Sequence, residues 1–147
     1  MLSARLEELL FKAPGGSVLC GLTYGQPFAT APFAEWMDAA HRGKVELGEE
    51  EVRKLTCDAR PNGKGDRIET IWVTLDLAGY APPKALFKAL CAAVSGRVGN
   101  KGSSQGGLWR IWWFDGPPRG SVALHHDQSR LHLVVGPRAG ERLDELG

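Results

Sequence analysis

Residues 121–135 read SVALHHDQSRLHLVV. Two runs rich in apolar and β-branched residues flank Gln128 and Ser129, so the stretch predicts a β-hairpin with these two residues at its tip. A two-residue loop and a four-residue loop centred on the same point both place His125 opposite His132. The two imidazoles then share one face of the sheet, with Cβ atoms roughly 4.5–5.5 Å apart.

A second hairpin is predicted from about Lys54 to Leu77. Apolar residues alternate with polar ones on both sides of the stretch RPNGKGDR at residues 60–67. The dipeptide Asn62-Gly63 readily supplies the positive φ angles that a hairpin turn needs. Each run therefore has one apolar face and one polar face, which is typical of an antiparallel strand that is covered on one side.

Other segments predict helices and shorter strands around these hairpins. Helical spacing of apolar residues indicates helices at residues 2–10, 32–43 and 82–96, a short one beginning near Glu49–Glu51, and one at the C-terminal end. Residues 17–22 and 108–114 read as strands, and residues 96–107 as a glycine-rich loop. Because the strands come mostly as adjacent hairpins, we expect one α+β domain over residues 1–147. Its antiparallel sheet would have about five or six strands, with helices packed on one face.

Composition narrows the function classes. The 147 residues carry a formal net charge of +1, which argues against a surface that binds nucleic acid or an acidic membrane over its whole extent. No apolar run reaches the roughly 18 residues of a membrane helix, and Glu7 and Glu8 interrupt what would be a signal-peptide core. The three widely spaced cysteines indicate reduced core residues in a cytoplasmic protein.

The paired histidines are the first candidate site. Neutral imidazole nitrogens are good ligands for a divalent transition metal, and Asp127 could add a carboxylate. A metal bound by His125, His132 and Asp127 would suit a hydrolase or nuclease. The competing interpretation packs the two rings against Trp109 or Trp113, with no cofactor. A further histidine ligand is missing nearby, since His41 is distant in the sequence.

The same stretch resembles, over about ten residues, the metal-binding strand of relaxase and Rep-type HUH nucleases. The matching residues are 130–135, preceded by His126-Asp127. The family has a His-hydrophobic-His pair there, and Arg130 stands where the first of these histidines is expected. The nucleophilic tyrosine of that family has no recognisable counterpart, so the resemblance does not carry the activity over.

The aromatic strand LWRIWWF at residues 108–114 is the second candidate site. Arg110 and Trp112 point to one face, whereas Trp109 and Trp113 point to the other. Trp72 lies on the polar side of its own strand. An exposed aromatic face beside an arginine could anchor a protein partner or stack nucleic-acid bases; the alternative is a strand buried between two layers.

Basic residues in the loops extend this candidate surface. Arg97 and Lys101 lie in the expected glycine-rich loop, Arg60, Lys64 and Arg67 flank the Asn-Gly turn, and Arg119 lies in the turn PPRG at residues 117–120. The proposed partner-binding residues are Trp72, Arg110, Trp112, Arg97 and Lys101. The competing interpretation is that the loop cations are ordinary solvated charges.

These observations favour a small binding module, such as an accessory, regulatory or inhibitor protein, over an enzyme. The aromatic residues and the lack of a complete catalytic set are the reasons. The expected partner is another protein. One alternative is the metal-dependent hydrolase or nuclease centred on His125 and His132, and another is a single-strand nucleic-acid binder. Near-neutral charge counts against the last, because phosphate contacts usually supply most of such affinity. No membrane partner is expected.

Overall fold

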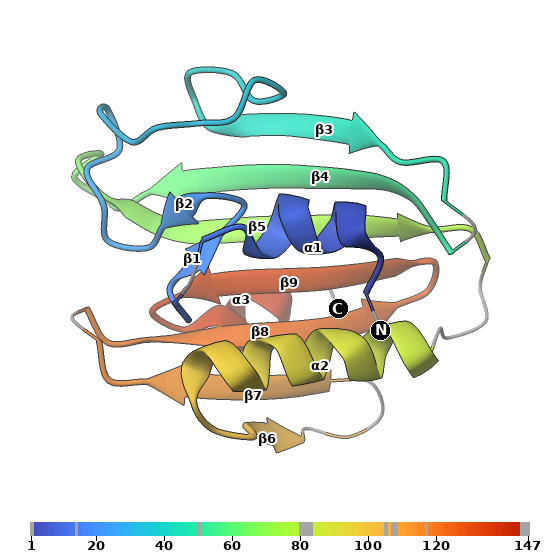
Figure 1. Cartoon of the computed structure of the whole chain (residues 1–147). Helices are drawn as coiled ribbons and strands as arrows, with labels where there is room; N and C mark the ends of the chain where they lie inside the picture. Colours follow the sequence, from blue (N-terminus) through green and yellow to red (C-terminus); the bar gives the residue numbers. More distant parts are fainter. Residues whose placement is uncertain are drawn as a thin grey trace.

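A seven-stranded antiparallel sheet organises the molecule (Figure 1), described here from a computed structural model. The order of the strands is β3-β4-β5-β9-β8-β7-β6, and every neighbouring pair is antiparallel. A separate two-stranded hairpin, β1-β2, lies beside α1 on one face of the sheet. The structure describes residues 2–13, 15–49, 51–79, 84–104, 106, 109–116 and 118–144, the side chains of 142–144 excepted.

Among the described residues the chain forms three helices and nine strands. The helices are α1 (Ala4–Phe11), α2 (Lys84–Val98) and α3 (Ala139–Asp144). The strands are β1 (Val18–Leu19), β2 (Leu22–Thr23), β3 (Arg42–Glu46), β4 (Val52–Pro61), β5 (Ile68–Leu77), β6 (Ser103–Ser104), β7 (Trp109–Phe114), β8 (Gly120–Asp127) and β9 (Arg130–Gly136).

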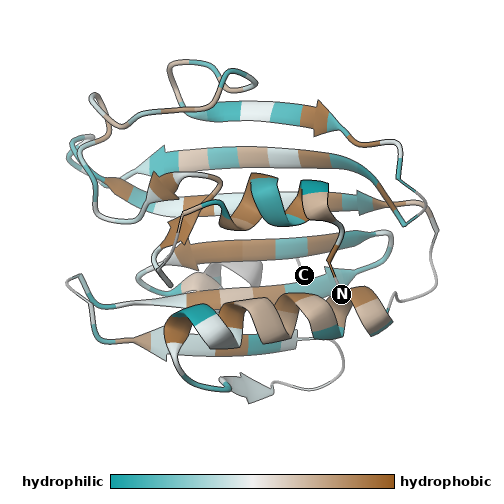
Figure 2. Cartoon of the chain, viewed as in Figure 1, coloured by the Kyte–Doolittle hydropathy of each residue, from teal (hydrophilic) through white to brown (hydrophobic). Residues whose placement is uncertain are grey.

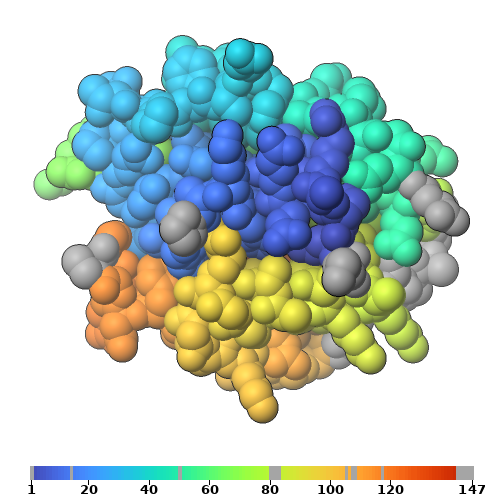
Figure 3. Space-filling model, viewed as in Figure 1, coloured from blue at the N-terminus to red at the C-terminus, as the bar shows by residue number. Residues whose placement is uncertain are grey.

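The main core lies between the sheet and the layer formed by α1, α2 and the β1-β2 hairpin (Figure 1). Alternate residues of β4, β5 and β9 point into it, so that Leu55, Leu75 and Leu131 face the helices side by side. The same alternation shows as changing colours along β4 in Figure 2. In the space-filling view, α1, α2 and the N-terminal segments cover much of this face (Figure 3). We call it the covered face.

The opposite face of the sheet carries a smaller cluster. Helix α3 packs there on β8 and β9, where Ala123, Val134 and Ala139 form a second buried group. The first residue of α3 is anchored to β8, because the Ser121 hydroxyl accepts a hydrogen bond from the Ala139 N–H at 2.8 Å. Trp72, Trp109 and Ile111 pack at the edge of this group.

The expected α+β class, with an antiparallel sheet and helices on it, is confirmed. Both predicted hairpins form, and the register of β8 and β9 places His125 opposite His132 as the sequence indicated. Gln128 adopts a positive φ of 53° at the tip. The main sheet has seven strands because the edge strands β3 and β6, which the sequence did not indicate, extend it; the short helix α3 lies on the opposite face.

The prediction of a helix at residues 32–43 is wrong. The segment forms turns, and residues from Arg42 onward form β3. The carboxylate of Asp38 accepts hydrogen bonds from the Ala40 and Arg42 N–H groups at 2.9 and 3.2 Å, which replaces helical hydrogen bonding by a local turn. His41 then takes a positive φ of 59°, and its Nε2 lies 2.8 Å from the Phe28 carbonyl oxygen.

Two further expectations need correction. The described residues next to Glu50 form no helix, since Glu49 and Glu51 belong to the connection between β3 and β4. Helix α2 does not end at Gly96 but continues to Val98, and Gly99 follows it with a φ of 90°. The start of that helix, expected at Pro82-Pro83, lies outside the described residues.

Trp112 is a core residue. Its side chain is 0% exposed, and its indole N–H donates to the Ser95 hydroxyl of α2 at 3.0 Å. The expectation that Trp112 belongs to an exposed aromatic surface is therefore wrong, because α2 covers that side of β7. Its neighbour Trp113 points to the other face and is 60% exposed.

Adjacent tryptophans should thus respond very differently to truncation. Trp112→Ala should lower the free energy of unfolding by about 3–5 kcal/mol, because it leaves a large cavity and an unpaired hydroxyl. Trp113→Ala should lower it by no more than about 0.5 kcal/mol. Urea denaturation followed by circular dichroism measures both values, and equal losses would contradict the assignment of the buried face.

Candidate functional site

The paired histidines lie on the face opposite α1 and α2, in a row that crosses four strands. Thr74, His132, His125 and Trp109 are cross-strand neighbours on β5, β9, β8 and β7. Trp72 joins the row diagonally from β5. The tilted rings of Trp109 and His125 have centroids 4.7 Å apart. The sequence-based interpretation that packs a histidine against Trp109 is thus the arrangement found.

A hydrogen bond from Trp72 fixes the state of His132. The indole Nε1 of Trp72 lies 3.2 Å from Nδ1 of His132. An indole N–H can only donate, so Nδ1 must accept. The proton of the neutral imidazole is then on Nε2, which is buried and has no hydrogen-bond partner among the described residues. The Thr74 hydroxyl also lies 3.3 Å from Nδ1.

Burial keeps His132 uncharged. Only 3% of the residue is exposed, and burial lowers the pKa of His132 to about 4. The neighbouring carboxylate of Asp127 opposes this shift, whereas His125 and Arg130 add to it. A second proton on the ring would also face the Trp72 N–H at Nδ1, so the fold selects the neutral form.

This arrangement argues against the metal centre considered for His125, His132 and Asp127. Neither nitrogen of His132 has a free lone pair for a metal, because the lone pair of Nδ1 accepts the hydrogen bond from Trp72 and Nε2 carries the proton. Within the described ranges, no group of three or more His, Cys, Asp or Glu side chains is placed to hold a metal ion. The histidine pair is best described as a structural layer between Trp72 and Trp109.

The basic residues proposed for partner binding are mostly tied to the protein itself. Arg97 donates Nη1 to the Phe11 carbonyl oxygen at 3.3 Å, and its guanidinium carbon lies 5.0 Å from the centre of the Phe11 ring. It therefore links the end of α2 to the end of α1 rather than projecting from a loop. Arg110 donates to the Lys101 carbonyl oxygen at 2.7 Å. The side chain of Lys101 is exposed.

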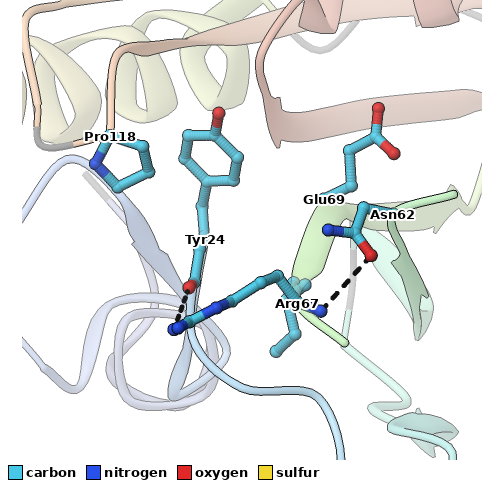
Figure 4. A pocket seen from close by; sticks show the side chains of 7 residues that line it. Tyr24, Asn62, Arg67, Glu69 and Pro118 are labelled. Atoms are coloured by element: carbon cyan, nitrogen blue, oxygen red, sulfur yellow. Dashed lines mark hydrogen bonds between the residues drawn. The ribbon is translucent and has the colours of Figure 1, made fainter. Parts of the chain in front are cut away.

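A different candidate site lies at the end of the sheet where three loops meet (Figure 4). We call this cavity of about 440 Å³ the loop-end pocket. Its lining comes from the segment after β2, the β4-β5 connection with the start of β5, and the β7-β8 turn. The lining residues are Tyr24, Gly25, Asn62, Arg67, Ile68, Glu69 and Pro118.

Hydrogen bonds fix the walls of the pocket. Tyr24 donates its hydroxyl proton to the Arg119 carbonyl oxygen at 2.9 Å, and its ring meets that of Phe114 edge-on at 6.2 Å. Arg67 donates to the Gly25 carbonyl oxygen at 3.2 Å. The side-chain oxygen of Asn62 accepts from backbone N–H groups of its own turn.

The two charged side chains of the pocket point in different directions. Figure 4 shows the Glu69 carboxylate and the Tyr24 hydroxyl on one side, whereas Arg67 extends to the other side, toward the backbone of Gly25. Burial and the negative charge of Glu69 raise the pKa of Tyr24. The charge of Glu69 therefore lies close enough to the phenol to affect it.

No protein-family model, curated protein or solved structure matches the chain. Within the described part of the chain, none of the helices combines the length and the apolar character needed to cross a bilayer.

Three residues that the sequence pattern singled out have structural roles: Trp112, Arg97 and His132. The loop-end pocket had no sequence signal of its own beyond the basic turns that contain Arg67 and Arg119.

The neutral state of His132 predicts a pH-dependent stability. Between its folded pKa of about 4 and its usual value of 6.5, the unfolded state binds more protons than the folded one. This contribution is fully present above pH 6.5 and is lost as the pH falls toward 4. From pH 7.5 to pH 5, His132 should account for a loss of about 2 kcal/mol in the free energy of unfolding.

Trp72→Phe tests how much the indole hydrogen bond adds to the effect of burial. Without the indole N–H, Nδ1 can carry a proton, so the pKa of His132 should rise somewhat from about 4 while burial still holds it below 6.5, and the loss between pH 7.5 and pH 5 should shrink in part. Trp113→Phe, at an exposed indole, is the matched control and should keep the wild-type dependence. NMR titration of the His132 ring gives the pKa directly; a value near 6.5 in the wild type would contradict the assignment.

Proposed function

We propose that this chain is a protein-binding module, and that it contacts its partner protein through the loop-end pocket and the exposed turns around it. The observation that carries the proposal is an apolar floor inside a polar rim. Ile68 and Tyr24 are 0% and 9% exposed, whereas Arg67 at the rim is exposed and Asn62 is half-buried. Energetically dominant contacts at protein interfaces are commonly made in such pockets, with a polar border that excludes water.

The charges around the pocket favour a protein over a nucleic acid. The exposed cations Lys64 and Arg119 lie in the same turns as the exposed acids Asp66 and Asp115. Arg119 also lies 3.8 Å from the Asp115 carboxylate in an exposed ion pair. A phosphate backbone would meet repulsion as well as attraction here, whereas a protein surface of mixed charge can match both signs.

The fixed walls also support binding. Tyr24 and Arg67 are held by hydrogen bonds to carbonyl groups of other loops. A site that is already ordered loses little conformational freedom when a partner binds, and this improves affinity. The alternative of a metal-dependent hydrolase or nuclease lacks such support, because His132 offers no lone pair.

Site-specific photocrosslinking in cells that produce the protein tests the proposal. A benzophenone amino acid at Lys64 or Arg119, both exposed rim residues, should crosslink one and the same protein. The same group at Lys84 or Lys88, exposed on α2 away from the pocket, is the control and should not capture it.

Mass spectrometry identifies the captured protein, and its affinity for the purified chain is then measured. We expect the affinity to fall only gradually as the salt concentration rises, since contacts with phosphate groups are not the main source of binding energy. Equal capture from α2 and from the rim, or no capture from the rim, would overturn the proposed docking site.

A further inference from the structure

We propose that a second cavity, between α1 and the turns at residues 32–36, accepts a segment of the partner protein that carries a large apolar side chain beside an arginine. This inference rests on the proposed protein-binding function and adds a second contact of stated chemistry. We call this cavity of about 470 Å³ the α1 groove. Helix α1, the β1-β2 turn and residues 32–36 line it.

The first argument is the apolar surface that the α1 groove presents. Phe33 and Trp113 are the exposed large apolar side chains among the described residues, and Phe33 is 49% exposed. The half-buried side chains of Leu9 and Trp36 line the groove together with Phe33. An apolar side chain of a partner would remove this surface from water, which is the main favourable term in most protein association.

The second argument is that the walls are ordered before anything binds. The ring of Phe33 meets the His41 ring edge-on, with centroids 5.5 Å apart. On the other side, the Cys20 N–H donates to the Leu10 carbonyl oxygen at 3.0 Å, which holds the β1-β2 turn against the end of α1. A groove with fixed walls loses little conformational freedom when a partner binds.

The third argument is charge. Glu8 on α1 and Glu35 in the turns at residues 32–36 both line the groove and are exposed. Neither carboxylate forms a hydrogen bond or an ion pair with another described residue. Lys12, one helical turn after Glu8, is the only cation of the described lining. Two carboxylates and one ammonium leave an excess of negative charge, so a cationic group of the partner is attracted and an anionic group is repelled.

The combination of carboxylates and aromatic rings favours arginine among the cations. A guanidinium pairs with carboxylates through two parallel hydrogen bonds and also stacks on aromatic faces, which Phe33 and Trp36 supply. A lysine ammonium is more strongly hydrated and lacks the planar shape. Ligand cavities commonly measure roughly 300–1,000 Å³, so the α1 groove has room for an apolar side chain beside the arginine.

One partner can reach the α1 groove and the loop-end pocket together, because the same segment of the chain contributes to both. Gly25 lines the loop-end pocket, and Phe33 lines the α1 groove. Between them, the Phe28 N–H donates to the Asp66 carbonyl oxygen at 2.9 Å, which fixes the segment to the β4-β5 connection. The two cavities therefore belong to one continuous and ordered surface.

Blocked tetrapeptides test the groove without knowledge of the partner. Acetyl-Gly-Leu-Arg-Gly-amide is titrated into the full-length ¹⁵N-labelled chain. We expect dose-dependent shifts of the Gly21, Ala34 and Glu35 amides. The matched peptide with citrulline in place of arginine has the same shape without the charge, and the peptide with serine in place of leucine lacks the apolar side chain. Each should bind about tenfold more weakly.

Variants assign the binding to the residues of the groove. The double variant Glu8→Gln/Glu35→Gln should weaken the leucine-arginine peptide by about tenfold, whereas Glu141→Gln, at an exposed residue of α3, should leave it unchanged. Phe33→Ser should weaken it as well, and Trp113→Ser, at the other exposed large apolar side chain, is the matched control. The amide spectrum of each variant shows whether it remains folded.

Three peptide results would overturn the inference: equal binding of the citrulline and serine peptides, preference for acetyl-Gly-Leu-Glu-Gly-amide, or no shift at about 10 mM peptide, where even very weak complexes form. A benzophenone amino acid at Lys12 should also capture the same protein as one at Lys64, and capture of no protein or of a different one would contradict the shared interface.

The two proposals fail in distinguishable ways. If the rim of the loop-end pocket crosslinks a partner but the α1 groove binds no peptide, the protein-binding function stands and only the second contact fails. If the α1 groove binds the peptide but the rim captures no protein, docking at the loop-end pocket fails instead.

Discussion

The structure depends on the burial of one apolar face of the two central strands, β5 and β9. Residues of this face, such as Val73, Leu75, Leu131 and Leu133, are at most 1% exposed beneath the helical layer. Removing several methylene groups from such a position typically costs about 2–5 kcal/mol, a large part of the stability of an ordinary domain. The other elements pack on, or extend, the sheet that these strands form.

That constraint also determines the chemistry of the opposite face. Once Leu131 and Leu133 point to the helices, His132 must point the other way, beside Trp72. The imidazole is enclosed before any ligand is present, and its acceptor nitrogen is used by an indole. A histidine pair that looks like half of a metal site in the sequence is therefore better explained as packing.

Much of the fold could be predicted from the sequence because its signals are local. Alternation and the turn residues define the hairpins around Gln128 and Asn62, and both form with the expected partners. The segment at residues 32–43 failed because helical spacing of Phe33, Trp36 and other apolar residues competes with the Asp38 carboxylate, which captures two backbone N–H groups. Helix propensity alone does not show whether the helical hydrogen bonds or the side-chain hydrogen bonds of Asp38 are the more stable.

The candidate site could not be predicted in the same way. The alternation of β7 separates Trp112 from Trp113 correctly, but it does not say which side a distant helix will cover. The loop-end pocket brings together Tyr24, Ile68 and Pro118, whose segments lie far apart in the sequence and meet only after the sheet has formed. The wall formed by Tyr24 likewise depends on a hydrogen bond to the Arg119 carbonyl oxygen, which no local pattern specifies.

The central claim is that a protein partner docks at the loop end of the sheet. Hydrogen exchange of the chain, alone and in complex with the captured partner, tests it most directly. The account predicts slower exchange at the backbone amides of residues 24–28, 62–69 and 118–120, with the edge strand β3 and the exposed side of α2 unchanged. Protection confined to β3 or α2, with the loop end unaffected, would contradict it.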